Sequence, residues 1–307
     1  MKSIDIVVLN WNTPQLTINT VKSLLKVKAN NFIYKILIID NGSTDNSVSQ
    51  FRRVFNTYKN IFVYNTGSNL GYVDGNNYGI NIALKTNPDY ILIVNSDVIV
   101  KPDFLQIMFE FLESHYDYGL VGPKIYFAPG FEFHKQRYLA KDLGKVIWSA
   151  GGVIDWDNIY GTNIGIDEVD IGQFNLPRSD VDYISGCCLL VRKEIFIKFG
   201  PFDSRYFMYL EDDEFSKRLV KNGIKIAYLP DSIIWHINAG SAQAGGGPLH
   251  DYFLTRNRLL FGFTYAPLRT KLALFRDSIR IYLAGTPWQK RGVIDFYLHK
   301  FGKGSWS

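Results

Sequence analysis

Asn95, Ser96 and Asp97 are polar residues that directly follow an apolar run, residues 90–94. A run of this length without polar alternation predicts a strand buried on both faces, at the centre of a parallel sheet. In open α/β sheets ligands bind at the carboxyl ends of the strands, so Asp97 would face a ligand. The alternative is an ordinary turn after a strand, because Asn, Ser and Asp favour turns without any function.

Polar side chains follow two other predicted strands in the same way. Asn10 and Asn12 come after the strand predicted over 4–9, and Asp40 comes after the strand predicted over 35–39. The edge of a nucleotide base needs donor and acceptor partners, and a sheet edge brings several side chains within reach of one ligand. Asp40 is the best candidate to accept the imide N–H of a pyrimidine. The alternative is that Asp40 only caps its own turn.

Two further groups of titratable residues occur in the second half of the chain. The acids at 211–214 begin a helix predicted over 211–219, in which Phe215 and Leu219 share a side that can face the core. Their alternative role is a solvated helix start, since the helix dipole favours negative charge in the first turn. His236 follows a short predicted strand, and its alternative role is that of a core histidine with a satisfied N–H.

Alternating strands and helices position these residues. The pattern predicts a Rossmann-like, mostly parallel α/β sheet flanked by helices and wound with right-handed connections. No G-x-G-x-x-G follows the first strand and no G-x-x-x-x-G-K-[ST] occurs, which argues against a dinucleotide dehydrogenase or a P-loop enzyme. Residues 127–176 are rich in Gly, Asp and aromatics and predict hairpins and loops. The predicted strands are 4–9, 35–39, 61–64, 90–94, 187–191 and 233–235, with helices near 16–27, 45–55 and 75–84 among them.

Length and composition indicate a globular chain. Its 307 residues suit one large α/β domain with an appendage, or two modest domains. Cys187 and Cys188 are adjacent, which suits neither a disulfide nor a metal site, so we expect a reduced, cytoplasmic chain. The start of the sequence has no signal-peptide pattern, and no apolar run approaches the length of a membrane span.

Positive charge is concentrated in residues 266–307. This stretch has eight Lys or Arg against two Asp, or +6, whereas the whole chain is +5, so the excess does not indicate general nucleic-acid binding. Residues 268–283 and 290–300 are predicted amphipathic helices. They either pack on the catalytic domain or on a second subunit of a homodimer, or they attach to the anionic inner leaflet of a membrane. The predicted apolar stripe of the first helix is Leu268, Leu272, Phe275, Ile279 and Leu283, with Arg269, Lys271, Arg276 and Arg280 off it.

An ordered set of short motifs resembles the inverting glycosyltransferases of family 2, which have the GT-A fold, and most of all the bacterial rhamnosyltransferase-type enzymes. The resemblance covers nearly all of residues 3–262, and each motif is weak alone. The motifs are Val8-Leu9-Asn10-Trp11-Asn12, residues 39–45, Asn69-Leu70-Gly71-Tyr72, Gly75-Asn76-Asn77, Asn95-Ser96-Asp97, Ser185-Gly186, residues 188–193, Gly200-Pro201-Phe202-Asp203, residues 207–212, Trp235-His236, Tyr252 and Arg256-Asn257.

The resemblance implies a role for each matching residue. Asp97 would bind the metal, with His236 joining the metal or diphosphate, and Asp212 would be the catalytic base, next to Glu211. Position 95 is Asn where the family's D-x-D motif has Asp, and the acids after Asp212 allow the base to shift by one residue. Arg256, after a flexible segment at 245–247, would hold the diphosphate if that segment closes as a lid. The nucleotide-binding set is Leu9, Asn10, Asn12, Asp40, Asn69, Gly71, Asn95, Ser96 and Arg256.

The implied function is a metal-dependent, inverting transfer of a sugar, with rhamnose as the candidate, from a dTDP- or UDP-sugar. The acceptor would be a glycan or a lipid-linked oligosaccharide in bacterial surface polysaccharide synthesis, at the inner face of the cell membrane. Mn²⁺ or Mg²⁺ would act as a Lewis acid for the departing diphosphate. The domains would be 1–265 for catalysis, with a nucleotide half at 1–120 and an acceptor half at 121–265, and 266–307 as a basic tail.

Two alternatives belong to other functional classes. A catalytically silent binding or scaffold protein of the same fold would be expected to lose Asp97, Asp212 or His236, and all three are present. A sugar-nucleotide nucleotidyltransferase would require a Gly-rich signature with basic residues near the N-terminus, which the sequence lacks.

Overall fold

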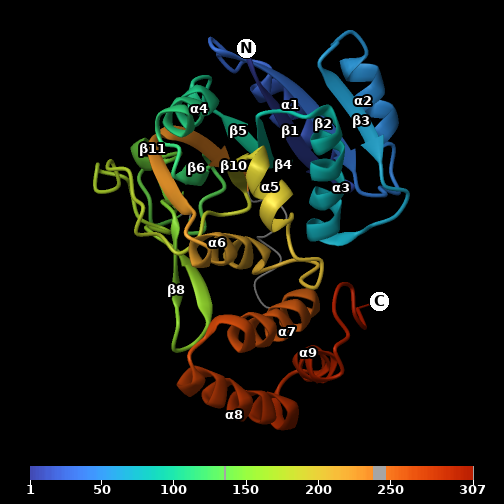
Figure 1. Cartoon of the computed structure of the whole chain (residues 1–307), viewed down its shortest axis with the longest axis vertical. Helices are drawn as coiled ribbons and strands as arrows, with labels where there is room; N and C mark the ends of the chain where they lie inside the picture. The colour runs from blue at the N-terminus through green and yellow to red at the C-terminus, as the bar shows by residue number, and fades with distance from the viewer. Residues whose placement is uncertain (135, 238–246, 307) are drawn as a thin grey trace.

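A central sheet is the frame of the molecule in the computed structural model, which describes residues 1–134, 136–237 and 247–306 (Figure 1). Within those ranges, nine strands join in the order β3-β2-β1-β4-β10-β6-β11-β5, with β7 paired to β6, and β8 and β9 form a separate ribbon. The strands are β1 (Lys2–Asn10), β2 (Phe32–Asp40), β3 (Ile61–Asn65), β4 (Tyr90–Asn95), β5 (Val98–Val100), β6 (Tyr118–Phe127), β7 (Ile147–Ser149), β8 (Gly152–Asp155), β9 (Tyr160–Asn163), β10 (Cys188–Arg192) and β11 (Lys225–His236).

Parallel pairing brings the predicted strand ends to one edge. β1 is parallel to both β2 and β4, and its register sets Asn10 beside Asp40 and Leu9 beside Asn95. β2 and β3 are parallel, as are β6 and β11, whereas β10, β5 and β7 run the other way. The predicted α/β fold with a Rossmann-like, mostly parallel sheet is therefore confirmed.

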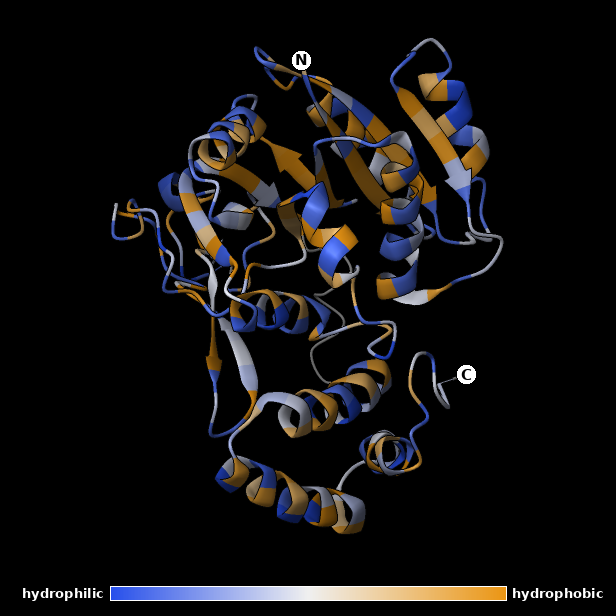
Figure 2. Cartoon of the chain, in the orientation of Figure 1, coloured by the Kyte–Doolittle hydropathy of each residue, from blue (hydrophilic) through white to orange (hydrophobic). Residues whose placement is uncertain are grey.

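Both faces of the sheet are buried, because side chains alternate along a strand. Ile6 and Val8 of β1 pack under α1, α2 and α4, whereas Val7 between them packs under α3 on the other face. All of 90–94 is buried, as its unbroken apolar run predicts. Figure 2 shows the strands coloured as mostly apolar. The helices of this part are α1 (Pro14–Leu24), α2 (Ser47–Phe55), α3 (Gly71–Thr86), α4 (Phe104–Ser114), α5 (Lys193–Phe199) and α6 (Glu211–Lys221), with a 3₁₀ turn at η1 (Ala140–Asp142).

Several elements differ from the sequence pattern. The structure adds β5, α4 and β6 after β4, and the short strand predicted at 233–235 is the end of the longer β11. Pro230 and Asp231 interrupt the apolar pattern of β11, where its register against β6 shifts between Leu229 and Ile233. Proline cannot donate to the ladder, so such a bulge hides a long strand from a search for regular alternation.

Three helices form a layer below the sheet, α7 (Pro248–Tyr265), α8 (Leu268–Ala284) and α9 (Pro287–Tyr297) (Figure 1). α7 packs against both α8 and α9, so the predicted C-terminal helical extension is confirmed. No helix in the described parts of the chain is long and apolar enough to cross a membrane.

The packing face of α8 is not the predicted apolar stripe. Thr270, Leu274 and Ser278 are the buried residues of α8, and a Cβ at Gly262 of α7 would lie 2.2 Å from Leu274 Cδ1. Most of the predicted stripe is exposed, with Leu268 74% and Leu272 55% exposed, whereas Phe275 and Ile279 line a groove between α8 and α9. α8 therefore packs on α7, within the range 1–265 predicted for the catalytic domain, as one alternative expected, but it does so through a face other than the predicted stripe. Small side chains let the two helices approach closely on a different face, and Figure 2 shows apolar and polar residues alternating along α8.

Candidate active site

A cavity of about 920 Å³ lies beyond the carboxyl end of β4. It brings together Asn95, Asp97, Asp212 and His236, although these residues are far apart in the sequence. The volume is within the range of ligand-binding clefts in proteins. Aromatic side chains make up much of its wall, and the sequence analysis did not assign them to the site. They are Trp11, Tyr72, Trp148, Tyr160, Tyr183, Tyr209 and Trp306.

Asp97 and His236 form a pair in the cavity. Asp97 lies in the turn between β4 and β5, and His236 ends β11, which pairs antiparallel with β5. Asp97 Oδ1 is 3.2 Å from His236 Nε2, and the amide of Ile237 donates to the Asp97 carbonyl at 2.8 Å. Trp148 and the imidazole form an edge-to-face pair, with ring centroids 4.7 Å apart. His236 Nδ1 is buried and has no hydrogen-bond partner among the described residues.

This pair fits a metal that arrives with a diphosphate. No group of three or more His, Cys, Asp or Glu able to hold a metal occurs within the described residues. Asp97 and His236 offer one carboxylate and one imidazole, and Mn²⁺ or Mg²⁺ bound to nucleotides takes its other ligands from phosphate and water. Asn95 is already in contact with Tyr72, whose hydroxyl lies 3.1 Å from Asn95 Oδ1.

Asp212 is the acid of the 211–214 run that faces the cavity as a partly exposed carboxylate. Its oxygens accept from the amides of Gly186 at 2.8 Å and Asp213 at 3.1 Å. Glu211 and Asp213 are buried, and burial, reinforced by the charge of Asp212, raises the pKa of both. Both residues therefore favour the protonated form, which cannot accept a proton, whereas Asp212 is the partly exposed carboxyl group of the run.

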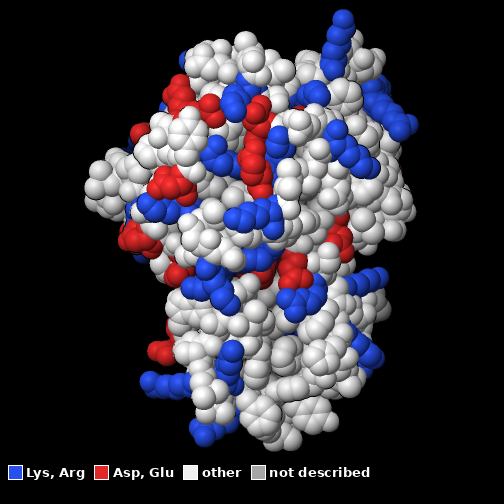
Figure 3. All heavy atoms as spheres, in the orientation of Figure 1, with Lys and Arg blue, Asp and Glu red and all other residues white. Residues whose placement is uncertain are grey.

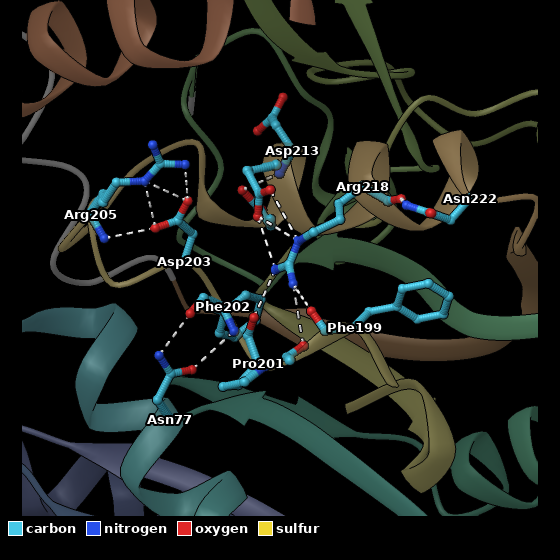
Figure 4. A network of polar contacts seen from close by, with 12 residues as sticks. Asn77, Phe199, Pro201, Phe202, Asp203, Arg205, Asp213, Arg218 and Asn222 are labelled. Atoms are coloured by element: carbon cyan, nitrogen blue, oxygen red, sulfur yellow. Dashed lines mark hydrogen bonds and ion pairs between the residues drawn. The ribbon is translucent and has the colours of Figure 1, made fainter. Parts of the chain in front are cut away.

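Glu214 has a structural role, but it is buried and not part of the solvated helix start that the alternative predicted. It pairs with Arg218 at 3.0 Å and accepts from the hydroxyl of Tyr265 at 2.7 Å. Figure 4 shows Arg218 reaching from α6 to the carbonyls of Phe199 and Pro201. These contacts fix α6 against the loop that follows α5.

The loop before α6 is held in an unusual conformation. Phe207, Tyr209 and Leu210 have φ of 65°, 67° and 67°, in the left-handed region that residues with a side chain rarely adopt. Asn257 of α7 donates from Nδ2 to the carbonyls of Tyr206, Met208 and Tyr209, at 2.9, 2.7 and 3.0 Å. Such strain persists only where surrounding contacts enforce it, and it often occurs beside functional sites.

Arg256 does not reach the cavities. It is fully buried, and its guanidinium donates to the carbonyls of Arg205, Tyr206 and Gly302. The structure therefore contradicts the expectation that Arg256 holds the diphosphate, because main-chain carbonyls already occupy its donors. Gly245 and Gly246 of the expected lid lie outside the described residues, and Gly247 immediately precedes α7.

Asp40 is also buried rather than open to a base. Its oxygens accept from Asn10 Nδ2 at 2.9 Å, Asn65 Nδ2 at 2.8 Å and the Ser43 amide at 3.0 Å. These bonds tie the ends of β1, β2 and β3 together, and the fully buried side chain offers no exposed oxygen to a base. In this conformation the Asx-turn alternative describes Asp40 better.

A second cavity of about 420 Å³ adjoins the strand ends. Of the predicted nucleotide residues, Leu9, Asn69 and Gly71 line it, while Asn95 lines the first cavity. The remaining predicted residues have structural contacts. Asn10 is buried beside Asp40, Asn12 Oδ1 accepts from the Thr44 amide at 2.9 Å, and the Ser96 carbonyl accepts from Thr20 Oγ1 at 2.8 Å.

Comparisons with known proteins agree with this architecture. Residues 5–200 match the family described as Glycosyl transferase family 2. The chain is 28% identical over 214 residues to the N-acetylglucosaminyl-diphospho-decaprenol L-rhamnosyltransferase of Mycobacterium tuberculosis, covering 67% of each chain. It is 28% identical over 216 residues to the Rhamnosyltransferase WbbL of Escherichia coli, covering 68% of this chain and 75% of the relative.

A solved structure shares the fold. The mannosyltransferase PcManGT from Pyrobaculum calidifontis, in complex with GDP-Man and Mn²⁺, superposes with a TM-score of 0.54 at 14% identity, over 96% of this chain and 74% of that one. The resemblance seen in the motifs is confirmed. The chain belongs to glycosyl transferase family 2 and is a glycosyltransferase with the GT-A fold.

Proposed function

We propose that this glycosyltransferase is a metal-dependent inverting enzyme that uses a nucleoside-diphosphate sugar. The observation that supports it best is that Asp97, His236 and the partly exposed Asp212 line one cavity. The Asp97–His236 pair would hold Mn²⁺ or Mg²⁺, which would stabilise the negative charge on the departing diphosphate. PcManGT, which shares the fold, is described in complex with Mn²⁺.

Asp212 would act as the general base. The acceptor hydroxyl would give its proton to Asp212 as its oxygen forms a bond to the anomeric carbon, and the bond from that carbon to the diphosphate would break. Attack from the side opposite the diphosphate inverts the configuration. The amide of Gly186, at 2.8 Å, holds the carboxylate in a fixed orientation for this transfer.

The donor would occupy both cavities, with its nucleotide against Leu9, Asn69 and Gly71 and its sugar beside Asp97. We propose a dTDP- or UDP-sugar, with rhamnose as the candidate because two relatives are rhamnosyltransferases. Residues 1–120 would form the nucleotide half and 121–265 the acceptor half of the catalytic domain. Trp148 and Tyr160 line the first cavity from the acceptor half and offer faces on which a sugar ring can pack.

The acceptor would be a lipid-linked glycan in the synthesis of a bacterial surface polysaccharide. The name of the Mycobacterium relative describes an acceptor on decaprenol diphosphate. A lipid-linked acceptor requires the enzyme to work at a membrane surface. We therefore propose that α8 attaches the enzyme to the anionic inner leaflet of the cell membrane.

The exposed surface of α8 has the composition of a helix that lies in a membrane interface. Its apolar stripe is uncovered, and Arg276 and Lys271 lie on opposite flanks of that stripe at about 100° per residue. Basic residues near an anionic surface contribute about 1 kcal/mol each. Figure 3 shows that the lower part of the visible face carries more Lys and Arg than Asp and Glu.

A donor screen tests the proposed reaction. Purified protein would be incubated with dTDP-rhamnose, UDP-sugars and GDP-mannose, with Mn²⁺, Mg²⁺ or a chelator, and release of nucleoside diphosphate measured. We expect turnover with a dTDP- or UDP-sugar that the chelator abolishes. Tight donor binding without turnover, even with lipid-linked acceptors present, would favour the scaffold alternative. Formation of a nucleotide sugar from a sugar phosphate and a nucleoside triphosphate would favour the nucleotidyltransferase.

Vesicle co-sedimentation tests the membrane attachment. We expect binding to anionic vesicles that weakens with salt and is lost in Leu272→Asp and Ile279→Asp, which change the exposed stripe. Ile171→Asp is the matched control, because Ile171 is also an exposed apolar residue but belongs to the loop between β9 and β10 and not to α8. Equal behaviour of all variants would refute membrane attachment through the stripe. A dimer that dissociates in the stripe variants would instead assign the stripe to a second copy of the chain.

A further inference from the structure

The segment after α9 returns to the proposed donor site. We call residues 299–306 the tail hook. Figure 1 shows the chain rising from α9 toward the lower end of α3. Lys303 and Trp306 of the tail hook line the second cavity together with Leu9, Asn69 and Gly71, and Trp306 also lines the first cavity. The sequence analysis assigned this segment only to a membrane or packing role.

A buried carboxylate anchors the tail hook to α7 and α9. Asp295 of α9 is fully buried, and Ser305 donates to it from its amide at 2.8 Å and from Oγ at 3.0 Å. The hydroxyl of Tyr252 in α7 donates to the same carboxylate. Trp306 then packs on Trp288, with ring centroids 4.6 Å apart.

Arg256 provides a second anchor. It donates to the Gly302 carbonyl at 2.7 Å, and the Gly302 amide donates to the Arg205 carbonyl at 2.9 Å. Gly304 has φ of 58°, and a Cβ there would lie 2.1 Å from the Tyr252 hydroxyl. The path of the tail hook is therefore fixed by contacts that only glycine permits at this position.

The charge of the two cavities is strongly unbalanced without the tail hook. The Asp97 and Asp212 carboxylates line the first cavity. Lys303 is the single Lys or Arg among the described residues that line either cavity, and it is exposed and makes no ion pair with another described residue. A diphosphate carries several negative charges, and ionised partners form the stronger hydrogen bonds to it.

We infer that the tail hook completes the donor site of the proposed glycosyltransferase. Lys303 binds a phosphate group of the nucleoside-diphosphate donor, and Trp306 forms a wall that the nucleotide cavity shares with the cavity of Asp97 and Asp212. Arg256 is a positioning residue, because it holds the tail hook and not the diphosphate. This inference rests on the proposed function, since it requires a nucleotide-sugar donor.

Calorimetry on the full chain tests the role of Lys303. We expect Lys303→Ala to bind dTDP or UDP about tenfold more weakly, a change of about 1.4 kcal/mol. Binding of the nucleoside without phosphate should not change, and Lys303→Arg should restore affinity for the diphosphate. Lys300→Ala is the matched control, because Lys300 is an exposed cation of the same tail hook that lines neither cavity.

The outcomes separate the inference from the proposed function. If the wild-type chain binds a nucleoside diphosphate but Lys303→Ala binds it equally well, the inference is wrong while the donor class stands. If the wild-type chain binds none of them, the proposed function itself is wrong. For Trp306→Ala we expect a raised donor KM that Trp306→Phe partly restores, with far-UV circular dichroism unchanged in both. An unchanged donor KM in Trp306→Ala would remove Trp306 from the site.

Discussion

Asn257→Ala is the substitution that most directly tests how the fold positions Asp212. Asn257 makes three hydrogen bonds to the left-handed loop before α6. The NH2 group shares two hydrogens among these three carbonyls, and Oδ1 accepts one further bond from Arg256 Nε. At about 1 kcal/mol for each of these three bonds, the wild-type side chain contributes about 3 kcal/mol to the free energy of unfolding. The three left-handed residues of this loop cost about 1 kcal/mol each or more. The stabilisation from Asn257 and the strain of the loop are similar in size, so without the Asn257 side chain the strain is no longer offset and the left-handed conformation loses its stabilisation.

We therefore expect two results from Asn257→Ala. Urea unfolding should show a loss of up to about 3 kcal/mol, reduced by any strain that the loop releases. Sugar transfer should fall more than tenfold, because α6 and the Asp212 carboxylate begin directly after this loop. Asn19→Ala is the control, since Asn19 is exposed on α1 and its removal should change stability by less than about 0.5 kcal/mol. Full activity together with a stability loss below that value would refute the role of Asn257.

Three further predictions follow from the site. Asp97→Ala should abolish metal-dependent donor turnover, and near wild-type turnover that still responds to a chelator would place the metal elsewhere. Asp212→Asn should retain donor binding while transfer falls about 10²-fold or more, and a larger loss in Asp213→Asn would move the base by one residue. Burial raises the pKa of Asp295, but hydrogen bonds from Tyr252 and Ser305 outweigh it and lower the pKa below its usual value. Asp295 therefore stabilises the fold above its unfolded pKa of about 4, and this stabilisation is lost as the pH falls through the lower folded pKa. Tryptophan fluorescence, which reports on Trp288 and Trp306 beside Tyr252, the partner of Asp295, should show a transition below about pH 4 during acid titration. The Asp295→Asn variant should lack this transition.

The alternating part of the fold could be predicted from the sequence because each element there carries its own signal. Residues 90–94 are uniformly apolar, and the structure buries all of them. The full length of β11 could not be predicted beyond 233–235, since Pro230 and Asp231 break its pattern and its pairing with β6 depends on residues about a hundred positions earlier. The sequence correctly predicts that α8 is an amphipathic helix with an apolar stripe, but a helical pattern does not show which side of the helix packs against the rest of the protein. The packing side is set by Gly262 of α7, because only a residue without a side chain leaves room there for Leu274 of α8.

Prediction of the site was limited by how polar groups satisfy one another. A motif aligns Asp40 and Arg256 with ligand-binding roles, yet both are buried and their hydrogen bonds go to other protein groups. Only three-dimensional structure shows which polar atoms remain for a ligand. The aromatic wall and Lys303 were missed for the opposite reason. Trp11, Tyr72 and Tyr209 lie within motifs but have no assigned role there. The other aromatic residues and Lys303 lie outside the motifs, and they reach the cavities from β7, the ribbon β8–β9, a loop and the tail hook.

One continuous set of contacts joins the proposed donor and acceptor chemistry. Arg256 bonds to Gly302 in the tail hook and to Arg205 and Tyr206 before α6, while its neighbour Asn257 bonds to the same loop. Asn257 Oδ1 also accepts from Arg256 Nε at 3.1 Å, so the two side chains act as one unit. A displacement of the tail hook would therefore shift the loop before α6 and the Asp212 side chain at the start of that helix. If this coupling operates, Arg256→Lys should raise the donor KM and lower kcat together, because a single ammonium cannot bond to both segments in the fixed geometry of a guanidinium.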